Sequence, residues 1–273
     1  MAGRWCVSLR STHPTYSPDQ AWSGLVFAPA ATPGYHDAMP PFFLKRRHLQ
    51  PELMDQPRLD KPRHYQALDG LHRLNVASGT CRQLWRSVRA TLGLRQRRLR
   101  MLDVASGGGD VPLGMWKLAQ RDGVDLEILG VDASLAACEY AASRAQPHAA
   151  SFAFKQLDVT REQLPAGFDV VTCSLFLHHL TAEQASDLLT NMAAAGELLL
   201  VSDLRRSAGG YALAQLACRM LTCSPIVRSD GPQSVANAFT LGEMRELCER
   251  AGIKNATTEA VWPFRLMVMH QAR

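Results

Sequence analysis

The sequence predicts an α/β protein built on a doubly wound, mostly parallel β-sheet with helices on both faces. From residue 99 onward, short apolar runs alternate with longer segments whose apolar residues recur at helical spacing. The short runs are almost continuously apolar, which is typical of strands covered on both faces. With 273 residues, of which 47% are hydrophobic, the chain is long enough to bury a substantial core.

The expected elements follow one another in a regular order. Seven strands are expected, at 99–105, 125–132, 151–159, 168–177, 197–203, 255–261 and 264–270. Helices are expected at 110–123, 134–146, 181–196 and 240–252. Ser134 is placed to be an N-cap, and Thr181 with Gln184 three residues later forms a capping box.

Three regions are expected along the chain. Residues 1–50 are rich in proline and turn formers and indicate a poorly ordered tail, with Met39 a plausible true start. We expect that deletion of residues 1–38 leaves folding and activity intact. Residues 51–98 contain two short amphipathic helices within 64–94, a helical lid region, and residues 99–273 form the α/β domain.

Charge and cysteine content limit the function classes. The net charge is +5, but residues 1–100 hold 16 Lys and Arg against 6 Asp and Glu, whereas the rest of the chain is acidic. We therefore attribute the basic excess to tail and surface, and expect no nucleic-acid partner. Seven cysteines without a C-x-x-C pair indicate reduced thiols and a cytoplasmic protein. No apolar run approaches the ~18 residues of a transmembrane segment.

Acidic residues follow three successive strands, at the edge where ligands bind in such sheets. Asp103 precedes a glycine-rich turn (Gly107 to Gly109), and a carboxylate aimed at that turn suits a cation better than a pyrophosphate. Asp132 lies at the spacing of a carboxylate that accepts ribose hydroxyls, and Asp158 occupies the same edge. The alternatives are a simple tight turn at the glycines and helix capping by Asp132.

On these residues the chain resembles the class I S-adenosylmethionine-dependent methyltransferases, which have a Rossmann-like fold. The resemblance covers 99–273 and implies S-adenosylmethionine as cofactor. It implies that the D-x-G-x-G-x-G loop holds the methionine part, with Ala105 in place of the first glycine, that Asp132 binds ribose, and that Asp158 and Val159 contact adenine. The cofactor-binding set it implies is Asp103, Ala105, Ser106, Gly107, Gly109, Asp132, Ala133, Asp158, Val159 and Ser174.

The segment 168–180 is similar to the fourth-strand motif that lines the methyl-transfer site in that family. It ends in His178 and His179, where a histidine of near-neutral pKa could take a phenol's proton. We expect His179, ahead of His178, to be the base, although one histidine could cap the following helix while the other packs. No metal is expected, because only Asp203 provides a carboxylate after the fourth and fifth strands.

The acceptor is expected to be a small molecule. Residues 204–239 are an insertion that would close the acceptor pocket, and the apolar stretch 210–225 within it favours an aromatic, quinone-like or polyketide-like acceptor; it could equally be a core or interface helix. The expected acceptor contacts are Phe176, Arg205, Arg206 and Tyr211, with both arginines alternatively solvated. The competing functions are an RNA methyltransferase and a non-catalytic, cofactor-binding scaffold. Acceptor identity and oligomeric state stay open.

Overall fold

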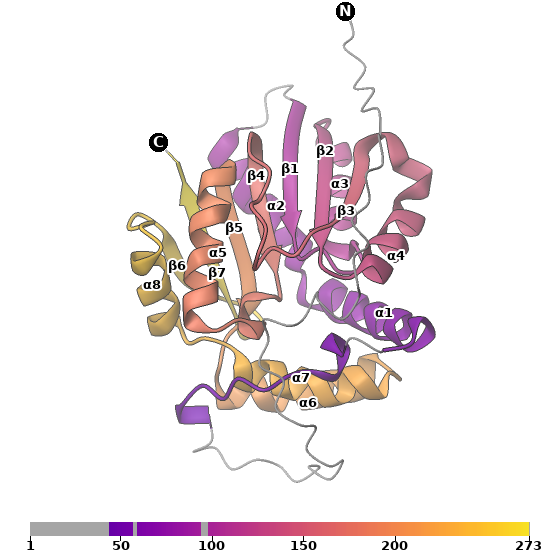
Figure 1. Ribbon diagram of the computed structural model, residues 1–273, viewed down its shortest axis with the longest axis vertical. Helices are drawn as coiled ribbons and strands as arrows, with labels where there is room; N and C mark the ends of the chain where they lie inside the picture. The colour runs from indigo at the N-terminus through magenta and orange to yellow at the C-terminus, as the bar shows by residue number, and fades with distance from the viewer. Residues whose placement is uncertain (1–43, 57–58, 94–97, 273) are drawn as a thin grey trace, which may run out of the picture.

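The protein is described by a computed structural model over residues 44–56, 59–93 and 98–272. A seven-stranded sheet has the order β3-β2-β1-β4-β5-β7-β6, with β7 antiparallel to both of its neighbours and the other pairs parallel (Figure 1). The predicted doubly wound, mostly parallel sheet is confirmed. The strands are β1 (Arg98–Val104), β2 (Asp125–Asp132), β3 (Phe152–Gln156), β4 (Phe168–Ser174), β5 (Gly196–Leu204), β6 (Thr257–Val261) and β7 (Arg265–Gln271).

Eight α-helices surround this sheet in the described part of the chain. They are α1 (Lys61–Ser78), α2 (Thr80–Leu92), α3 (Asp110–Arg121), α4 (Leu135–Ala145), α5 (Ala182–Ala195), α6 (Ala208–Leu221), α7 (Pro225–Asn237) and α8 (Leu241–Arg250). Three short 3-10 turns are η3 (Leu53–Asp55), η4 (Gln146–Ser151) and η5 (Leu177–His179). The predicted caps are confirmed, because Ser134 accepts from Ala137 N and Thr181 with Gln184 forms a complete capping box.

The core has two halves, one on each face of the sheet. One half joins the strands to α5 and α8, through residues such as Leu189 and Leu247, and the other joins them to α2 and α3, through residues such as Leu84 and Met115. Burial of these side chains on both faces explains why the strands read as continuous apolar runs. None of the described helices combines the length and apolar character needed to cross a bilayer.

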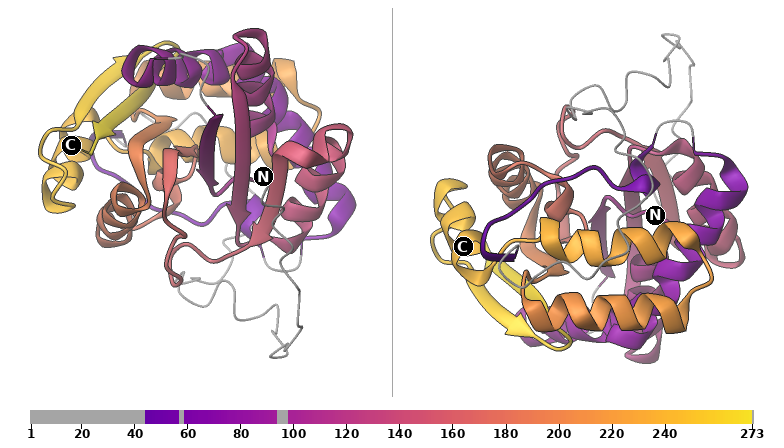
Figure 2. Two further views of the ribbon diagram at one scale, coloured as in Figure 1. Left: turned by 90° about the horizontal axis from the view of Figure 1, so that it is seen from above. Right: turned by 90° about the horizontal axis from the view of Figure 1, so that it is seen from below.

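Beyond the carboxyl ends of the parallel strands lie α1, α6 and α7 (Figures 1 and 2). Helices α6 and α7 pack against each other, and α1 contacts both of them. At Gly70 of α1, an added Cβ would lie 2.5 Å from Thr222 Oγ1, so the absence of a side chain permits this close approach. Residues 204–239 are therefore largely helical, and their second helix, α7, contains Pro232.

Part of the region expected to be a poorly ordered tail is attached to the domain. Residues 44–56, here called the N-terminal strap, run along α7 (Figure 2). Arg47 donates to the carbonyl oxygens of Asn237, His178 and Leu180 at 2.5, 2.9 and 2.6 Å. The tail boundary at residue 50 is thus corrected for residues 44–50, which these contacts hold in place. Residues 1–38 and the candidate start at Met39 lie outside the described residues.

Candidate active site

A cavity of about 590 Å³ lies where the carboxyl ends of the parallel strands meet the helical cover. Its floor consists of the turns that follow β1, β2 and β4, and its other walls come from α1, α6, α7 and the N-terminal strap. Nine of the ten residues expected to bind the cofactor line it, namely Asp103, Ala105, Ser106, Gly107, Asp132, Ala133, Asp158, Val159 and Ser174. The cavity has the size of a small-molecule site.

The turn after β1 depends on left-handed backbone conformations. Gly107 and Gly109 have φ of +50° and +70°, and Ala105, at the position of the family's first glycine, has φ of +54°. Gly109 does not line the cavity. A Cβ at this position would lie 2.9 Å from the Cβ of Ala141 in α4, so Gly109 serves helix packing rather than direct ligand contact.

Asp103 is a buried carboxylate with a single described hydrogen-bond donor. Thr172 Oγ1 donates to its Oδ1 at 2.5 Å. Burial raises the pKa of Asp103 to about 7, against this hydrogen bond, and the charges of Asp110 and Asp132 raise it further. A carboxylate in this position gains from a cationic partner, such as the amino group of a bound amino acid.

Asp132 connects the turn after β1 to the start of α4. Its Oδ2 accepts from Gly107 N and its Oδ1 from Ser134 N, both at 2.8 Å. Burial raises the pKa of Asp132, although the two backbone donors oppose the rise. Each carboxylate oxygen retains a lone pair that could accept a hydroxyl, as a ribose requires.

Two buried hydroxyls also fit a polar ligand. Within the described ranges, Ser106 Oγ and Ser174 Oγ have no hydrogen-bond partner, and both residues line the cavity. Buried polar atoms are normally paired, so orphans at a cavity wall indicate a missing ligand or water. Together with the carboxylates and the glycine turn, they fit S-adenosylmethionine, which carries an amine, ribose hydroxyls and a sulfonium.

The same cavity is lined by His178 and His179, which lie on η5, directly after β4. Nδ1 of His178 lies 2.6 Å from Asp203 Oδ1, and its backbone N donates to Oδ2 of the same carboxylate. Nδ1 of His179 lies 2.8 Å from Asp55 Oδ2. Both rings thus use Nδ1 for a carboxylate and have Nε2 left for other chemistry.

The carboxylates around the histidines change the proton affinities of the site. Burial alone would lower the pKa of His179, but Asp55 and Glu52 raise it to about 10. Burial would raise the pKa of Asp203, but His178 holds it below the usual value. The histidine end of the cavity is therefore a compact, buried cluster of opposite charges.

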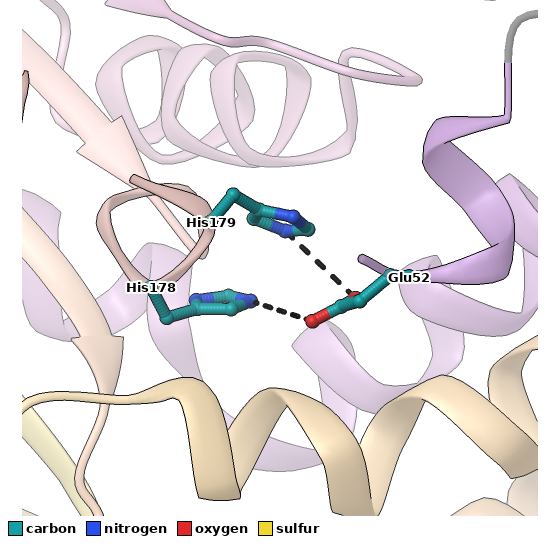
Figure 3. A group of neighbouring side chains, drawn as sticks. All are labelled: Glu52, His178 and His179. Atoms are coloured by element: carbon teal, nitrogen blue, oxygen red, sulfur yellow. Dashed lines mark ion pairs between the residues drawn. The ribbon is translucent and has the colours of Figure 1, made fainter. Parts of the chain in front are cut away.

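Glu52, from the N-terminal strap, faces both histidines (Figure 3). Its Oε1 lies 3.7 Å from His178 Nε2, and its Oε2 lies 3.9 Å from His179 Nε2. Sequence reasoning missed Glu52 and Asp55, because both lie more than a hundred residues before the histidines and follow no strand. Their only local signal is a pair of acids in a mostly basic segment.

Arg265 is another cavity residue that sequence reasoning missed. It is 4% exposed, and its Nη2 donates to Asn75 Oδ1 at 3.0 Å, while Nη1 has no partner within the described ranges. Asn75 also donates to Asp110, at the start of α3. Burial lowers the pKa of Arg265 to about 10, still well above neutrality. An arginine in an otherwise apolar strand was the signal available in the sequence.

The expected acceptor contacts divide into two groups. Phe176 lines the cavity and stacks on His179, with ring centroids 6.0 Å apart. Arg206 is a correction, because it lies away from the cavity and donates to Ala238 O and to Glu243, both at 2.6 Å, in a structural role. Arg205 and Tyr211 also lie outside the cavity lining, and the Arg205 guanidinium lies over the ring of Phe264.

The comparisons with known proteins agree with this geometry. Residues 101–196, which include the glycine turn and both histidines, match the family described as "Methyltransferase domain". The predicted resemblance to class I S-adenosylmethionine-dependent methyltransferases is confirmed. A search of curated protein sequences gave no match.

Solved structures show the same fold at low sequence identity. One is a protein from Nostoc punctiforme described as a candidate O-methyltransferase, with a TM-score of 0.52 and 17% identity over 72% of this chain. Another is the DszA carbon methyltransferase, with a TM-score of 0.54 and 15% identity over 74% of this chain. This chain covers 57% of the length of each of these two proteins.

Proposed function

We propose that this protein transfers the methyl group of S-adenosylmethionine to a small-molecule acceptor, namely a phenolic, quinone-like or polyketide-like oxygen or carbon. The observation that carries the proposal is that one cavity is lined both by the Asp103 and Asp132 carboxylates, here called the cofactor end, and by two carboxylate-bound histidines, the acceptor end. When bound, S-adenosylmethionine supplies an electrophilic methyl group on a sulfonium. The chain must then bind, align and activate the acceptor.

Each residue at the cofactor end has a distinct role in the proposal. Asp103 holds the amino group of the cofactor, and Asp132 accepts its ribose hydroxyls. Ser106 and Ser174 bring hydroxyls to the same cavity wall. The guanidinium of Arg265, with Nη1 unpaired in the described ranges, offers a donor to a carboxylate or another anionic group.

At the acceptor end, the free Nε2 atoms of His178 and His179 meet the nucleophile. Asp203 and Asp55 hold the two rings in orientation through Nδ1. Nε2 of a neutral ring can then take up a proton, whereas a protonated ring can offset negative charge on the acceptor. Asp55 and Glu52 raise the pKa of His179 to about 10, above the near-neutral value expected for the base, so both residues are candidates for the activating group.

The walls between the two ends favour an apolar acceptor. They carry Leu71 and Leu74 from α1, Leu213 and Ala214 from α6, and Val235 from α7. These side chains exclude water from the reacting atoms and suit an aromatic ring or a polyketide chain. None of these five side chains carries a positive charge for a phosphate backbone, which disfavours an RNA acceptor.

The proposal is tested in two steps with purified protein. Calorimetry should detect binding of S-adenosylhomocysteine, and mass spectrometry of a panel of phenols, quinones and polyketides should detect a methylated product. His178→Ala and His179→Ala are expected to lower kcat at least about a hundredfold while leaving cofactor affinity nearly unchanged. His270→Ala, on β7 and outside the cavity lining, is the matched control. Absence of cofactor binding would favour a non-catalytic scaffold.

A further inference from the structure

Glu52, His178 and His179 form a cluster in which both imidazole rings face the Glu52 carboxylate (Figure 3). One imidazole nitrogen from each histidine and one oxygen of Glu52 all lie within 4.8 Å of one another. The nitrogens that face Glu52 are the two Nε2 atoms: that of His178 lies 3.7 Å from Oε1, and that of His179 lies 3.9 Å from Oε2. Both distances are too long for a hydrogen bond, so these contacts leave the two nitrogens available to bind a metal ion.

The spacing suits a metal ion. Donor atoms bound to one tetrahedral zinc ion at about 2.0 to 2.2 Å lie roughly 3.3 Å apart. Each Nε2 lies about half an ångström farther than this from the Glu52 oxygen that it faces, at 3.7 and 3.9 Å. With all three ligand atoms within 4.8 Å of one another, the cluster has the dimensions of a metal-free site that contracts when it binds an ion.

Each of the three side chains is oriented by a second partner. Asp203 holds Nδ1 of His178 at 2.6 Å, and Asp55 holds Nδ1 of His179 at 2.8 Å. Ser234 Oγ donates to Glu52 Oε1 at 2.8 Å. A carboxylate on the second nitrogen of a ligating histidine is the usual outer-shell arrangement of protein metal sites, since it fixes the ring and its tautomer.

The charge of the cluster also calls for a cation. Glu52 and Asp203 are 6% and 1% exposed, and Asp55 lies beside them, so three carboxylates surround two imidazoles away from bulk water. Buried carboxylates need counter-charges. A divalent ion on the two Nε2 atoms would supply such a counter-charge in place of protons on the rings.

We propose that Glu52, His178 and His179 bind a divalent transition-metal ion of the zinc class, with its remaining coordination positions open to the cavity. Two imidazoles and one carboxylate favour such an ion over Mg²⁺ or Ca²⁺, which prefer oxygen ligands. All three residues line the cavity, so its interior is the source of any further ligand. The sequence predicted no metal because only Asp203 provides a carboxylate after the fourth and fifth strands. The carboxylate ligand of the proposed site comes instead from the N-terminal strap.

The ion has a defined use in the proposed reaction, and this part of the inference rests on the proposed function. A divalent cation at the histidine end would stabilise an acceptor oxygen anion as a Lewis acid. It therefore selects acceptors with a phenolic or enolic oxygen, and most strongly those with two neighbouring oxygens. An amine acceptor would gain less from such a site.

The test is metal binding measured directly. Full-length protein is freed of metal with a chelator and titrated with Co²⁺, followed by visible d–d absorption, and with Zn²⁺ by calorimetry. We expect one equivalent to bind, and we expect Glu52→Gln, His178→Ala and His179→Ala each to weaken affinity by about a hundredfold or more. His64→Gln is the matched control, because His64 lines the same cavity but lies outside the cluster.

The outcomes separate this inference from the proposed function. Binding of S-adenosylhomocysteine and thermal melting report whether each variant is folded. The inference is overturned if the metal-free protein takes up no Co²⁺ or if folded cluster variants retain wild-type affinity. If the chelated enzyme keeps full methyl transfer, the role of the ion in the reaction is overturned and the proposed function stands. If the metal binds but no cofactor does, the site survives and the proposed function fails.

Discussion

At the residue scale, the two carboxylates at the cofactor end differ in what satisfies them. Asp132 receives two backbone N–H groups and is structurally engaged before any ligand arrives. Asp103 receives only the Thr172 hydroxyl in the described structure, and its pKa is raised to about 7 by burial. Of the two carboxylates, Asp103 is thus the one whose protonation state a cationic ligand can change most.

Cofactor binding should therefore depend on pH through Asp103. Below its pKa the carboxyl must lose a proton before it can pair with an amine, so affinity rises as pH increases through about 7. We expect S-adenosylhomocysteine to bind about tenfold more tightly at pH 8 than at pH 6, which calorimetry measures. Asp103→Asn should bind weakly with a flat profile, and the exposed Asp187→Asn should behave as wild type. A steep profile in Asp103→Asn would contradict this assignment.

At the scale of elements, the N-terminal strap is held by specific hydrogen bonds rather than by regular secondary structure. The backbone N–H groups of Leu53 and Met54 donate to the two oxygens of Asp230, each at 3.0 Å. Gln50 exchanges two bonds with the Asn237 amide. Arg47 adds its three bonds to carbonyl oxygens and packs over the Phe239 ring at 3.7 Å.

Loss of the Arg47 side chain should loosen the strap. Arg47→Ala removes charge-assisted bonds and leaves buried carbonyl groups unpaired, which should lower the free energy of unfolding by roughly 2 to 4 kcal/mol. We expect faster proteolysis within the strap and a raised KM for the acceptor. Cofactor affinity should change little, because the predicted cofactor residues all follow residue 98. Limited proteolysis with steady-state kinetics checks this, and Arg46→Ala, an exposed neighbour, is the control.

At the scale of the whole molecule, local patterns predicted the sheet and the cofactor end of the cavity. The alternation of strands and helices predicts a mostly parallel sheet. The carboxyl ends of its parallel strands meet at one edge, which brings Asp103, Asp132 and Asp158 together. The histidine end could be predicted only in part. Glu52 and Asp55 reach it through strap contacts with α7, and no periodicity or spacing encodes contacts between such distant segments.

Helix α7 and Arg206 show the same limit. The sequence of α7 contains Gly231 and Pro232, which favour a turn, yet packing on α6 and the strap holds it helical. From its place after a strand, Arg206 was expected to be available to an acceptor or to solvent. Its guanidinium instead donates to Glu243 and to two backbone carbonyl oxygens. In both cases tertiary contacts, rather than the local sequence, decide the conformation or the partners.

Two N-terminal deletions can separate the function of the strap from cofactor binding by the α/β domain. Deletion of residues 1–38 leaves every described strap contact in place, since these begin at Leu44, whose carbonyl accepts from Arg206. We expect this variant to keep wild-type cofactor binding and turnover. Deletion of residues 1–56 removes Glu52 and Asp55 and leaves Asp230 and Asn237 without the backbone groups that pair with them.

The longer deletion should therefore retain binding of S-adenosylhomocysteine while losing methyl transfer and uptake of Co²⁺. Calorimetry, product analysis and visible absorption on both variants measure the three properties side by side. The basic N-terminal hundred residues would then contribute to function through two of their few acids. Full turnover in the longer deletion would instead place acceptor activation entirely on η5 and β5, with His178 and Asp203 sufficient for it.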